Sequence, residues 1–274
     1  MKLLILGGNG MAGHVLVDYF RKHGHQVFYT SRDMTDPAGL VLDVSDISAV
    51  EHTVRSVRPD IIINAVGVLN QFAEEDKINA YNINGFLPHR LRHMAEQISA
   101  RLIHISTDCV FLGSRGSYRE DDAPDGTSVY AITKALGEIH DPNHMTIRTS
   151  IIGPEIRKDG IGLFGWFMRQ QGLVRGYRNV WWNGVTTLEL AKAMDYFMKQ
   201  SFGGLIHLAH PEPVSKHELL LLFQEIWGKT DVSIEPDDNM VQDRTLVSTR
   251  EDIAYTLPAY RQMLQEMREW QSGA

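Results

Sequence analysis

The segment that most restricts the fold of this chain is a glycine-rich turn close to its first residue. An apolar run, Leu3 to Leu6, is typical of a buried strand, and residues 7–13 then lead into a helical pattern of apolar side chains. A strand, a glycine-rich turn and a helix in this order are the context that a dinucleotide-binding loop requires. In such a loop the glycines permit the tight turn, the close approach of a pyrophosphate and the packing of the helix on the strand. The predicted cofactor-binding residues of this turn are Gly7, Asn9, Gly10, Met11 and Gly13.

The end of the second predicted strand bears on the choice of cofactor. Gln26 to Thr30 reads as a strand and is followed by Ser31 and Arg32. At this position an acidic residue would bind the ribose hydroxyls of NAD. A hydroxyl and a guanidinium suit the 2′-phosphate of NADP instead, although Asp33 follows directly. We therefore favour NADP(H), and the sequence leaves NAD(H) open.

The remaining strand patterns alternate with helical patterns. This rhythm predicts an α/β fold with a doubly wound parallel sheet, the Rossmann fold. Asp43, at the end of the third strand, would meet the adenine edge, and small residues after the fourth strand leave room for a nicotinamide ribose. Further strands are read at 40–44, 60–67, 102–105, 146–152 and 204–209. The cofactor-binding candidates at these strand ends are Asp43, Val44, Ala65, Val66 and Gly67.

From about residue 153 the alternation changes, which predicts a second, smaller unit. We expect a dinucleotide-binding domain of residues 1–152 plus about 186–209, and a small C-terminal substrate-binding lobe of about 153–185 and 210–274. Within the first unit, a long helical region from about Ala73 to Gln97 is expected to be interrupted near Pro88. The C-terminal part shows one short strand pattern, Val232 to Ile234, and a final helix after Pro258.

The candidate catalytic residues lie in the stretch 106–134. Ser-Thr-Asp at 106–108 follows an apolar strand, so Thr107 would lie at the strand end. Tyr130 and Lys134 are four residues apart on a predicted helix and therefore share one face. A nearby ammonium lowers the pKa of a phenol from its ordinary value of about 10, which would make Tyr130 a usable general acid at neutral pH. A solvated Tyr–Lys pair on a surface helix would have the same spacing.

The composition limits which kinds of partner the protein can bind and in which cellular compartment we expect it. The chain has 27 basic and 34 acidic residues, a formal net charge of −7 and no basic block, which argues against a nucleic acid or an anionic membrane as partner. Cys109 is the only cysteine, so there is no intrachain disulfide, and the apolar N-terminal run is too short for a signal peptide. No His, Cys and Asp cluster has metal-ligand spacing, so we expect no metal. A cytoplasmic protein is the expectation.

Several motifs, in this order, resemble the extended short-chain dehydrogenase/reductases, and among them the dTDP-4-dehydrorhamnose reductases and related nucleotide-sugar reductases. The Ser-Thr-Asp piece and the Tyr-x-x-x-Lys-x-x-Gly-Glu piece are fairly specific for this family, whereas the glycine turn is not. The matching pieces are residues 7–13, 57–65, Asn84 with Pro88, 106–111, 130–138, 148–150, 184–187 and 244–249.

The resemblance implies reduction of a nucleotide-linked 4-keto-6-deoxy sugar, for surface polysaccharide or glycan synthesis. Tyr130 would protonate the ketone oxygen, Lys134 would hold the nicotinamide ribose, and Thr107 would donate a hydrogen bond to the developing oxyanion. Weaker substrate-binding candidates are Asp108, Thr186 and Trp182, although core packing is the commoner fate of a tryptophan.

Two other functions stay open at this point. One is a nucleotide-sugar epimerase or dehydratase with tightly held NAD. Related dehydratases carry a carboxylate after the Thr-Asp pair, and Cys109 occupies that position here, which counts against dehydration. The other is a non-catalytic NADP-binding protein that resembles the regulatory subunit of methionine adenosyltransferase. Members of the family are monomers or homodimers, and the sequence does not choose between them.

Overall fold

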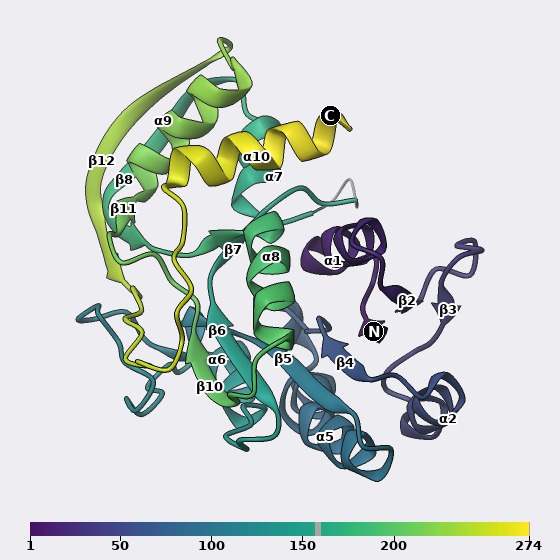
Figure 1. Cartoon of the computed structure of the whole chain (residues 1–274). Helices are drawn as coiled ribbons and strands as arrows, with labels where there is room; N and C mark the ends of the chain where they lie inside the picture. Colours follow the sequence, from purple (N-terminus) through teal and green to yellow (C-terminus); the bar gives the residue numbers. More distant parts are fainter. Residues whose placement is uncertain (157–159, 274) are drawn as a thin grey trace.

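The core of the molecule is a seven-stranded sheet, which the computed structural model, describing residues 1–156 and 160–273, builds in the order β10-β6-β5-β4-β1-β2-β3 (Figure 1). All neighbouring strands pair in parallel. The chain moves outward from β1 to β2 and β3 and then returns to the other side of β1, so the order reverses between β1 and β4. The strands are β1 (Lys2–Leu6), β2 (Gln26–Ser31), β3 (Leu40–Val41), β4 (Ile61–Asn64), β5 (Arg101–Thr107), β6 (Met145–Thr149) and β10 (Gly204–His207).

Helices cover both faces of this sheet, because alternate strand residues point to opposite sides. Leu3 and Ile5 of β1 pack with α1 and α8, whereas Leu4 and Leu6 pack with α2 and α5. The predicted doubly wound parallel sheet is therefore confirmed. The covering helices are α1 (Met11–Lys22), α8 (Thr187–Met198) and the C-terminal α10 (Tyr260–Ser272) on one side, and α2 (Ile47–Val57) and α5 (Leu87–Gln97) on the other.

The helical region between β4 and β5 differs from the expectation in where it breaks. It is divided into α3 (Asn70–Glu75), α4 (Lys77–Ala80), a π-helical turn η1 (Tyr81–Phe86) and α5. Asp76 ends α3 and caps α4, since its carboxylate accepts a hydrogen bond from Asn79 N at 3.1 Å. Pro88 does not interrupt a helix, because it lies in the first turn of α5, where a missing N–H costs nothing.

A second body of structure, built from the C-terminal half of the chain, lies beside the sheet (Figure 1). Its long strands β8 and β12 pair in parallel, β11 pairs antiparallel with β8, and α9 packs on them. The expectation of one short strand at 232–234 was wrong, because β12 continues through polar residues that face outward. Its elements are α7 (Leu163–Met168), β8 (Gly172–Trp182), β11 (Val214–Ser215), α9 (Lys216–Trp227) and β12 (Val232–Asp243).

This body has a hydrophobic cluster of its own, which includes Phe167, Trp182 and Phe223. Two short strands, β7 (Ile151–Ile152) and β9 (Val185–Thr186), pair in parallel where the chain passes between the two bodies. Among the described residues, no helix combines the length and the apolar character needed to cross a bilayer.

Candidate active site

A cavity of about 720 Å³ opens at the carboxyl ends of β1, β2, β4, β5 and β6. This is the edge at which the strand order reverses between β1 and β4, the usual ligand site of an open parallel sheet. Most of the residues predicted from the sequence are brought together there. Those lining the cavity are Gly7, Asn9, Gly10, Met11, Ser31, Arg32, Asp43, Val44, Ala65, Val66, Gly67, Thr107, Asp108, Tyr130 and Lys134.

The glycine turn leaves one end of the cavity free of side chains. Gly7 has a φ of +83°, and a Cβ there would lie 2.9 Å from Cγ2 of Val66. Helix α1 then begins at Met11, and Gly10 before it has no side chain to cap the first amides. Gly13 does not line the cavity. A Cβ at this position would come within 2.0 Å of Gly7 O, so Gly13 allows the helix to pack on the turn.

The end of β2 carries a hydrogen-bonded cluster that the sequence only partly indicated. Ser31 Oγ accepts from Asn9 Nδ2 at 2.9 Å and from Asp33 N at 3.0 Å. Asn9 Nδ2 also lies 3.2 Å from the carboxylate of Asp36, which accepts from Tyr29 Oη at 2.9 Å. Asp36 was missed, because its Asp-Pro-x-Gly sequence indicates a turn but not what that turn folds against.

Asp43 closes the same end of the cavity. Its Oδ1 accepts from Ser45 N at 2.9 Å and from Ser45 Oγ at 2.8 Å. The hydrogen bond from the Ser45 backbone, and less strongly the guanidinium of Arg32, lower the pKa of the Asp43 carboxyl. Asp43 and Arg32 both line this part of the cavity.

The loop after β4 is held by a residue of the π-helical turn. Asn84 accepts from Val68 N at 2.8 Å and donates to Val68 O at 2.9 Å. Its Nδ2 also lies 3.1 Å from Thr133 Oγ1, so one buried amide ties this loop to α6 (Val129–Leu136). Gly67, which lines the cavity, is thereby kept at a fixed position relative to the helix that carries Tyr130.

Thr107 is the last residue of β5, and its hydroxyl is already engaged. Oγ1 accepts from Cys109 N at 3.1 Å, which caps the short 3₁₀ turn η2 (Asp108–Val110), and it donates to Asp108 Oδ1 at 3.1 Å. Burial raises the pKa of the Cys109 thiol to about 12, so this side chain is a protonated thiol at neutral pH.

Tyr130 and Lys134 both face the cavity from α6, as their spacing predicted, but the expected electrostatic effect is absent. Burial, and then the neighbouring Cys109, raise the pKa of the Tyr130 phenol, and within the described part of the chain only a hydrogen bond with Thr107 opposes them. The prediction that Lys134 lowers this pKa was wrong. Lys134 Nζ instead donates to Ile105 O at 2.6 Å, and burial lowers the pKa of its own ammonium to about 8.

The model of the RmlD substrate binding domain family matches residues 1–261, nearly the whole chain. The chain belongs to this family. The nucleotide-sugar reductase resemblance read from the motifs is thereby confirmed at the level of the family.

Curated proteins resemble this chain in sequence over about half of its length. The spore coat polysaccharide biosynthesis protein SpsK of Bacillus subtilis is 31% identical over 139 residues, which cover 50% of this chain and 47% of SpsK. The dTDP-4-dehydrorhamnose reductase of Streptomyces griseus is 34% identical over 137 residues, 49% of this chain and 43% of that protein. This chain therefore spans about half the length of the curated relatives that it matches.

A solved structure shows that the likeness in fold extends over the whole chain. The dTDP-4-dehydrorhamnose reductase of Bacillus anthracis, crystallised in complex with NADP, superposes with a TM-score of 0.84. The match covers 97% of this chain and 98% of that one at 20% sequence identity. The likeness at this identity establishes the RmlD-like fold.

Two weaker candidates from the sequence do not reach the cavity. Thr186 is 1% exposed, and its hydroxyl accepts from Glu189 N at 3.1 Å as the N-cap of α8. Trp182 is 3% exposed and packs in the C-terminal hydrophobic cluster, with its ring centroid 5.6 Å from that of Tyr260. Both side chains are occupied by packing or capping rather than placed in the cavity.

The sequence missed Lys216, the first residue of α9. Its Nζ lies 5.3 Å from the ring centroid of Trp182. Burial lowers the pKa of this ammonium to about 8, while the carboxylate of Asp108 opposes the shift, so the lysine lies within electrostatic reach of the residue that follows Thr107. In the sequence Lys216 reads only as part of a helix start between Ser215 and Glu218, and no local signal connects it with residue 108.

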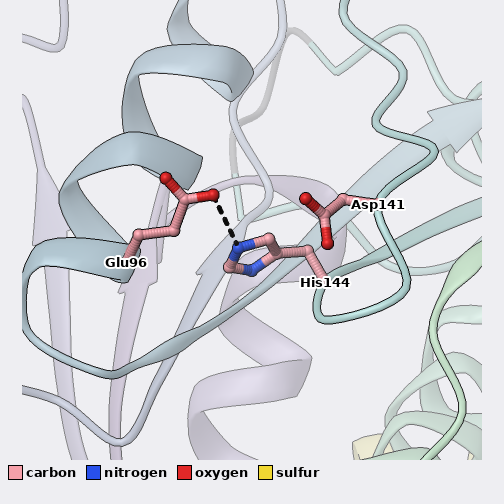
Figure 2. A group of neighbouring side chains, drawn as sticks. All are labelled: Glu96, Asp141 and His144. Carbon is pink, nitrogen blue, oxygen red and sulfur yellow. Dashed lines mark ion pairs between the residues drawn. The ribbon is translucent and has the colours of Figure 1, made fainter.

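One cluster away from the cavity has the composition of a metal site (Figure 2). Glu96, Asp141 and His144 offer ligand atoms within 4.8 Å of one another, and His144 Nε2 points at Glu96 Oε1 at 3.7 Å. However, His144 Nδ1 accepts from Leu102 N at 3.0 Å, so the neutral ring carries its proton on Nε2, where a metal would need a lone pair. Arg92 Nη1 already contacts both carboxylates, at 3.2 and 3.3 Å. A guanidinium therefore supplies the positive charge here.

Proposed function

We propose that this protein uses NADPH to reduce the keto group of a nucleotide-linked 4-keto-6-deoxy sugar, for polysaccharide or glycan synthesis. The observation that carries the proposal is that Thr107, Tyr130 and Lys134 line one cavity together with the glycine turn. A hydride acceptor bound there would have two hydroxyls beside it and a dinucleotide-binding loop at the far end. The names of the relatives, reductases of dTDP-4-dehydrorhamnose and a spore coat polysaccharide protein, support the same chemistry.

The residues of the cavity fit NADP(H), the cofactor bound to the Bacillus anthracis relative. Gly7 leaves space in the cavity that a Cβ would fill, and the uncapped start of α1 offers amides to a pyrophosphate. Ser31 and Arg32 would bind the 2′-phosphate, with Asp43 against the adenine. When bound, the cofactor supplies the hydride. Gly13 would act indirectly, by letting α1 pack on the turn. The proposed contacts on this side are Gly7, Asn9, Gly10, Met11, Ser31, Arg32, Asp43, Val44, Ala65, Val66, Gly67, Tyr130 and Lys134.

Tyr130 would act as the general acid. Because burial raises the pKa of its phenol, the side chain is protonated at neutral pH and has a proton to give. The phenol O–H bond breaks as the new alcohol O–H bond forms. The Thr107 hydroxyl, which donates to Asp108 Oδ1 in this structure, would turn to donate to the same oxygen as negative charge develops on it. Lys134, whose pKa lies near 8, can then return a proton to the phenolate.

The nucleotide part of the substrate would lie toward the C-terminal body. The carboxylate of Asp108 acts on the pKa of the Lys216 ammonium, so the two lie within electrostatic reach. Arg244 donates from Nε to Phe111 O at 2.9 Å, and its Nη1 lies 3.6 Å from Cys109 Sγ. These two cations beside η2 suit a diphosphate. With Asp108 they form the proposed sugar-nucleotide end of the site.

This arrangement supports a division of labour between the two bodies. We propose a dinucleotide-binding domain of residues 1–152 plus about 186–209, and a substrate-binding lobe of about 153–185 and 210–274, of which 157–159 and 274 lie outside the described residues. An enzyme that consumes NADPH and has one cysteine suits the cytoplasm, where we place it. A monomer and a homodimer both fit this proposal, and the mass of the protein in solution distinguishes them.

The test is cofactor consumption by the pure protein. NADPH or NADH would be followed with dTDP-, UDP- and GDP-linked 4-keto-6-deoxy sugars generated in situ. We expect net oxidation of NADPH with at least one of them and its loss in Tyr130→Phe. Turnover without net consumption, or with NAD that survives purification, would identify an epimerase or dehydratase. NADPH binding with no turnover of any sugar, together with co-purification of a larger enzyme, would identify a regulatory subunit.

A further inference from the structure

His104 is a buried histidine next to the proposed catalytic lysine that the function described so far does not use. It lies in the middle of β5, three residues before Thr107, and it is 0% exposed. Its Nδ1 lies 3.1 Å from Asn64 Nδ2, and its Nε2 lies 3.4 Å from Lys134 Nζ. The ring therefore connects β4 to the side chain that reaches the cavity from α6.

The direction of each hydrogen bond in this chain can be assigned. Asn64 Oδ1 accepts from Val66 N at 3.2 Å, which fixes the amide so that Nδ2, a donor, faces His104. His104 Nδ1 must then be the acceptor, and the neutral ring carries its proton on Nε2. That N–H points at Lys134 Nζ, which itself donates to Ile105 O at 2.6 Å.

The imidazole is neutral as well as correctly oriented. Burial, then the charges of Lys134 and His89, hold the pKa of His104 well below its ordinary value. An N–H can be accepted by Lys134 only through the lone pair of a neutral amine, because an ammonium has no acceptor. The donor of His104 thus favours the deprotonated state of the lysine.

We propose that His104 is a positioning residue that holds Lys134 Nζ against β5 by donating its Nε2–H to the lone pair of the neutral amine. Its meaning for catalysis rests on the proposed function, in which Lys134 returns a proton to Tyr130. The hydrogen-bond assignment itself does not depend on that function.

Other titratable groups around Lys134 also bear on its protonation. Glu138, one turn further along, favours the ammonium, and its carboxylate is itself bound to Arg148 at 2.6 Å. Tyr130 lies on the same helix and is neutral, since burial raises its pKa. His89 contributes to lowering the pKa of His104. Among the described residues, Glu138 is thus the charged group that favours the ammonium of Lys134, and burial acts against it.

The first experiment needs no variant and no substrate. Nitrogen NMR of the histidine-labelled protein would report the tautomer of His104 between about pH 6 and 9. We expect a protonated Nε2, an unprotonated Nδ1 and no conversion to imidazolium in this range. A proton on Nδ1, or a charged ring at pH 7, would overturn the proposal.

The second experiment measures Lys134 directly by NMR titration of labelled lysine side chains. His104→Asn keeps an acceptor for Asn64 Nδ2 and removes the donor toward Lys134. We expect the midpoint of Lys134, near pH 8 in the parent protein, to rise by about one pH unit. An unchanged midpoint in the folded variant contradicts the proposal. If His104→Asn does not fold, the tautomer in the parent protein decides alone.

His144→Asn is the matched control. His144 is also buried, and its Nδ1 likewise accepts a hydrogen bond, from Leu102 N instead of a side-chain amide. Its Nε2 faces Glu96 rather than Lys134 (Figure 2). This variant should leave the titration of Lys134 unchanged. Neither NMR readout needs turnover, so failure of the sugar-reductase assay would remove the proposed function and leave this inference standing.

Discussion

Glu138 and Arg148 form a bidentate ion pair that is 1% exposed on both sides, directly beneath the cavity. Arg148 Nε donates to Oε1 at 2.7 Å and Nη2 donates to Oε2 at 2.6 Å. Glu138 Oε1 also accepts from Ser106 Oγ at 2.7 Å, so the pair holds the strand residue that precedes Thr107. Arg148 Nη1 lies 3.2 Å from His207 Nε2, which carries the same network to the last strand of the sheet.

Breaking this pair should cost much of the stability of the fold. Arg148→Met keeps the length of the side chain but leaves the Glu138 carboxylate buried without its partner, for which we expect a loss of ~3–5 kcal/mol in the free energy of unfolding. Urea unfolding measures it. The control is Arg261→Met, which removes an equally bidentate but exposed pair with Glu225 and should change stability little. If both variants lost the same amount of unfolding free energy, burial of the Glu138–Arg148 pair would not explain its contribution to stability.

Arg32 should decide between the two nicotinamide cofactors. Arg32→Met removes the guanidinium proposed for the 2′-phosphate, and a charge-assisted hydrogen bond of this kind is worth about tenfold or more in affinity. We expect the preference for NADPH over NADH, measured as the ratio of kcat/KM values, to fall by about that factor. Arg55→Met, on the exposed surface of α2, is the control. A preference that survives the loss of Arg32 would assign the 2′-phosphate to another group.

The sequence predicted the central sheet and most of the cavity for one physical reason. Parallel strands buried on both faces read as apolar runs, and their carboxyl ends share one edge, so the polar residues after each run had to gather there. Gly7, Arg32, Asp43 and Thr107 were found in this way and line the cavity. An apolar run followed by polar residues is a local pattern, so it can be recognised without knowing which strands pair with one another.

Features made by contacts between distant segments were not predictable in the same way. Strand β12 was read only as 232–234, because its polar outward residues hide the pattern that pairing with β8 imposes. The spacing of Tyr130 and Lys134 places their Cβ atoms on one face but does not say that Nζ turns to Ile105 O. Lys216 reaches the site only through the packing of the C-terminal body.

Lys216 should contribute to binding of the sugar nucleotide more than to the chemical step. Its ammonium lies within electrostatic reach of Asp108, which lines the cavity, but Lys216 itself is not a lining residue. Lys216→Met should raise KM for the sugar nucleotide about tenfold and change kcat less, since one charge-assisted contact is lost. Steady-state kinetics at saturating NADPH separates the two constants. Lys199→Met, at the exposed residue that caps the C-terminus of α8, serves as control. A fall in kcat alone would assign Lys216 to the chemical step.

Lys134 should leave a signature in the pH dependence of stability. Its pKa is about 8 in the folded protein, against roughly 10.4 for an unfolded chain. Between these values the unfolded chain binds more protons than the folded one, so this lysine makes the folded state more stable as the pH rises.

Lys134→Met abolishes that contribution. The difference in unfolding free energy, parent minus variant, should therefore increase by about 2 kcal/mol from pH 7 to pH 10. Chemical unfolding of both proteins at the two pH values gives this difference directly, and all other titrating groups cancel in the comparison. A difference that is independent of pH would mean that Lys134 keeps an ordinary pKa, and with it a permanent charge. Because His104 is proposed to favour the neutral amine, the same pair of measurements in the His104→Asn background should give a smaller increase.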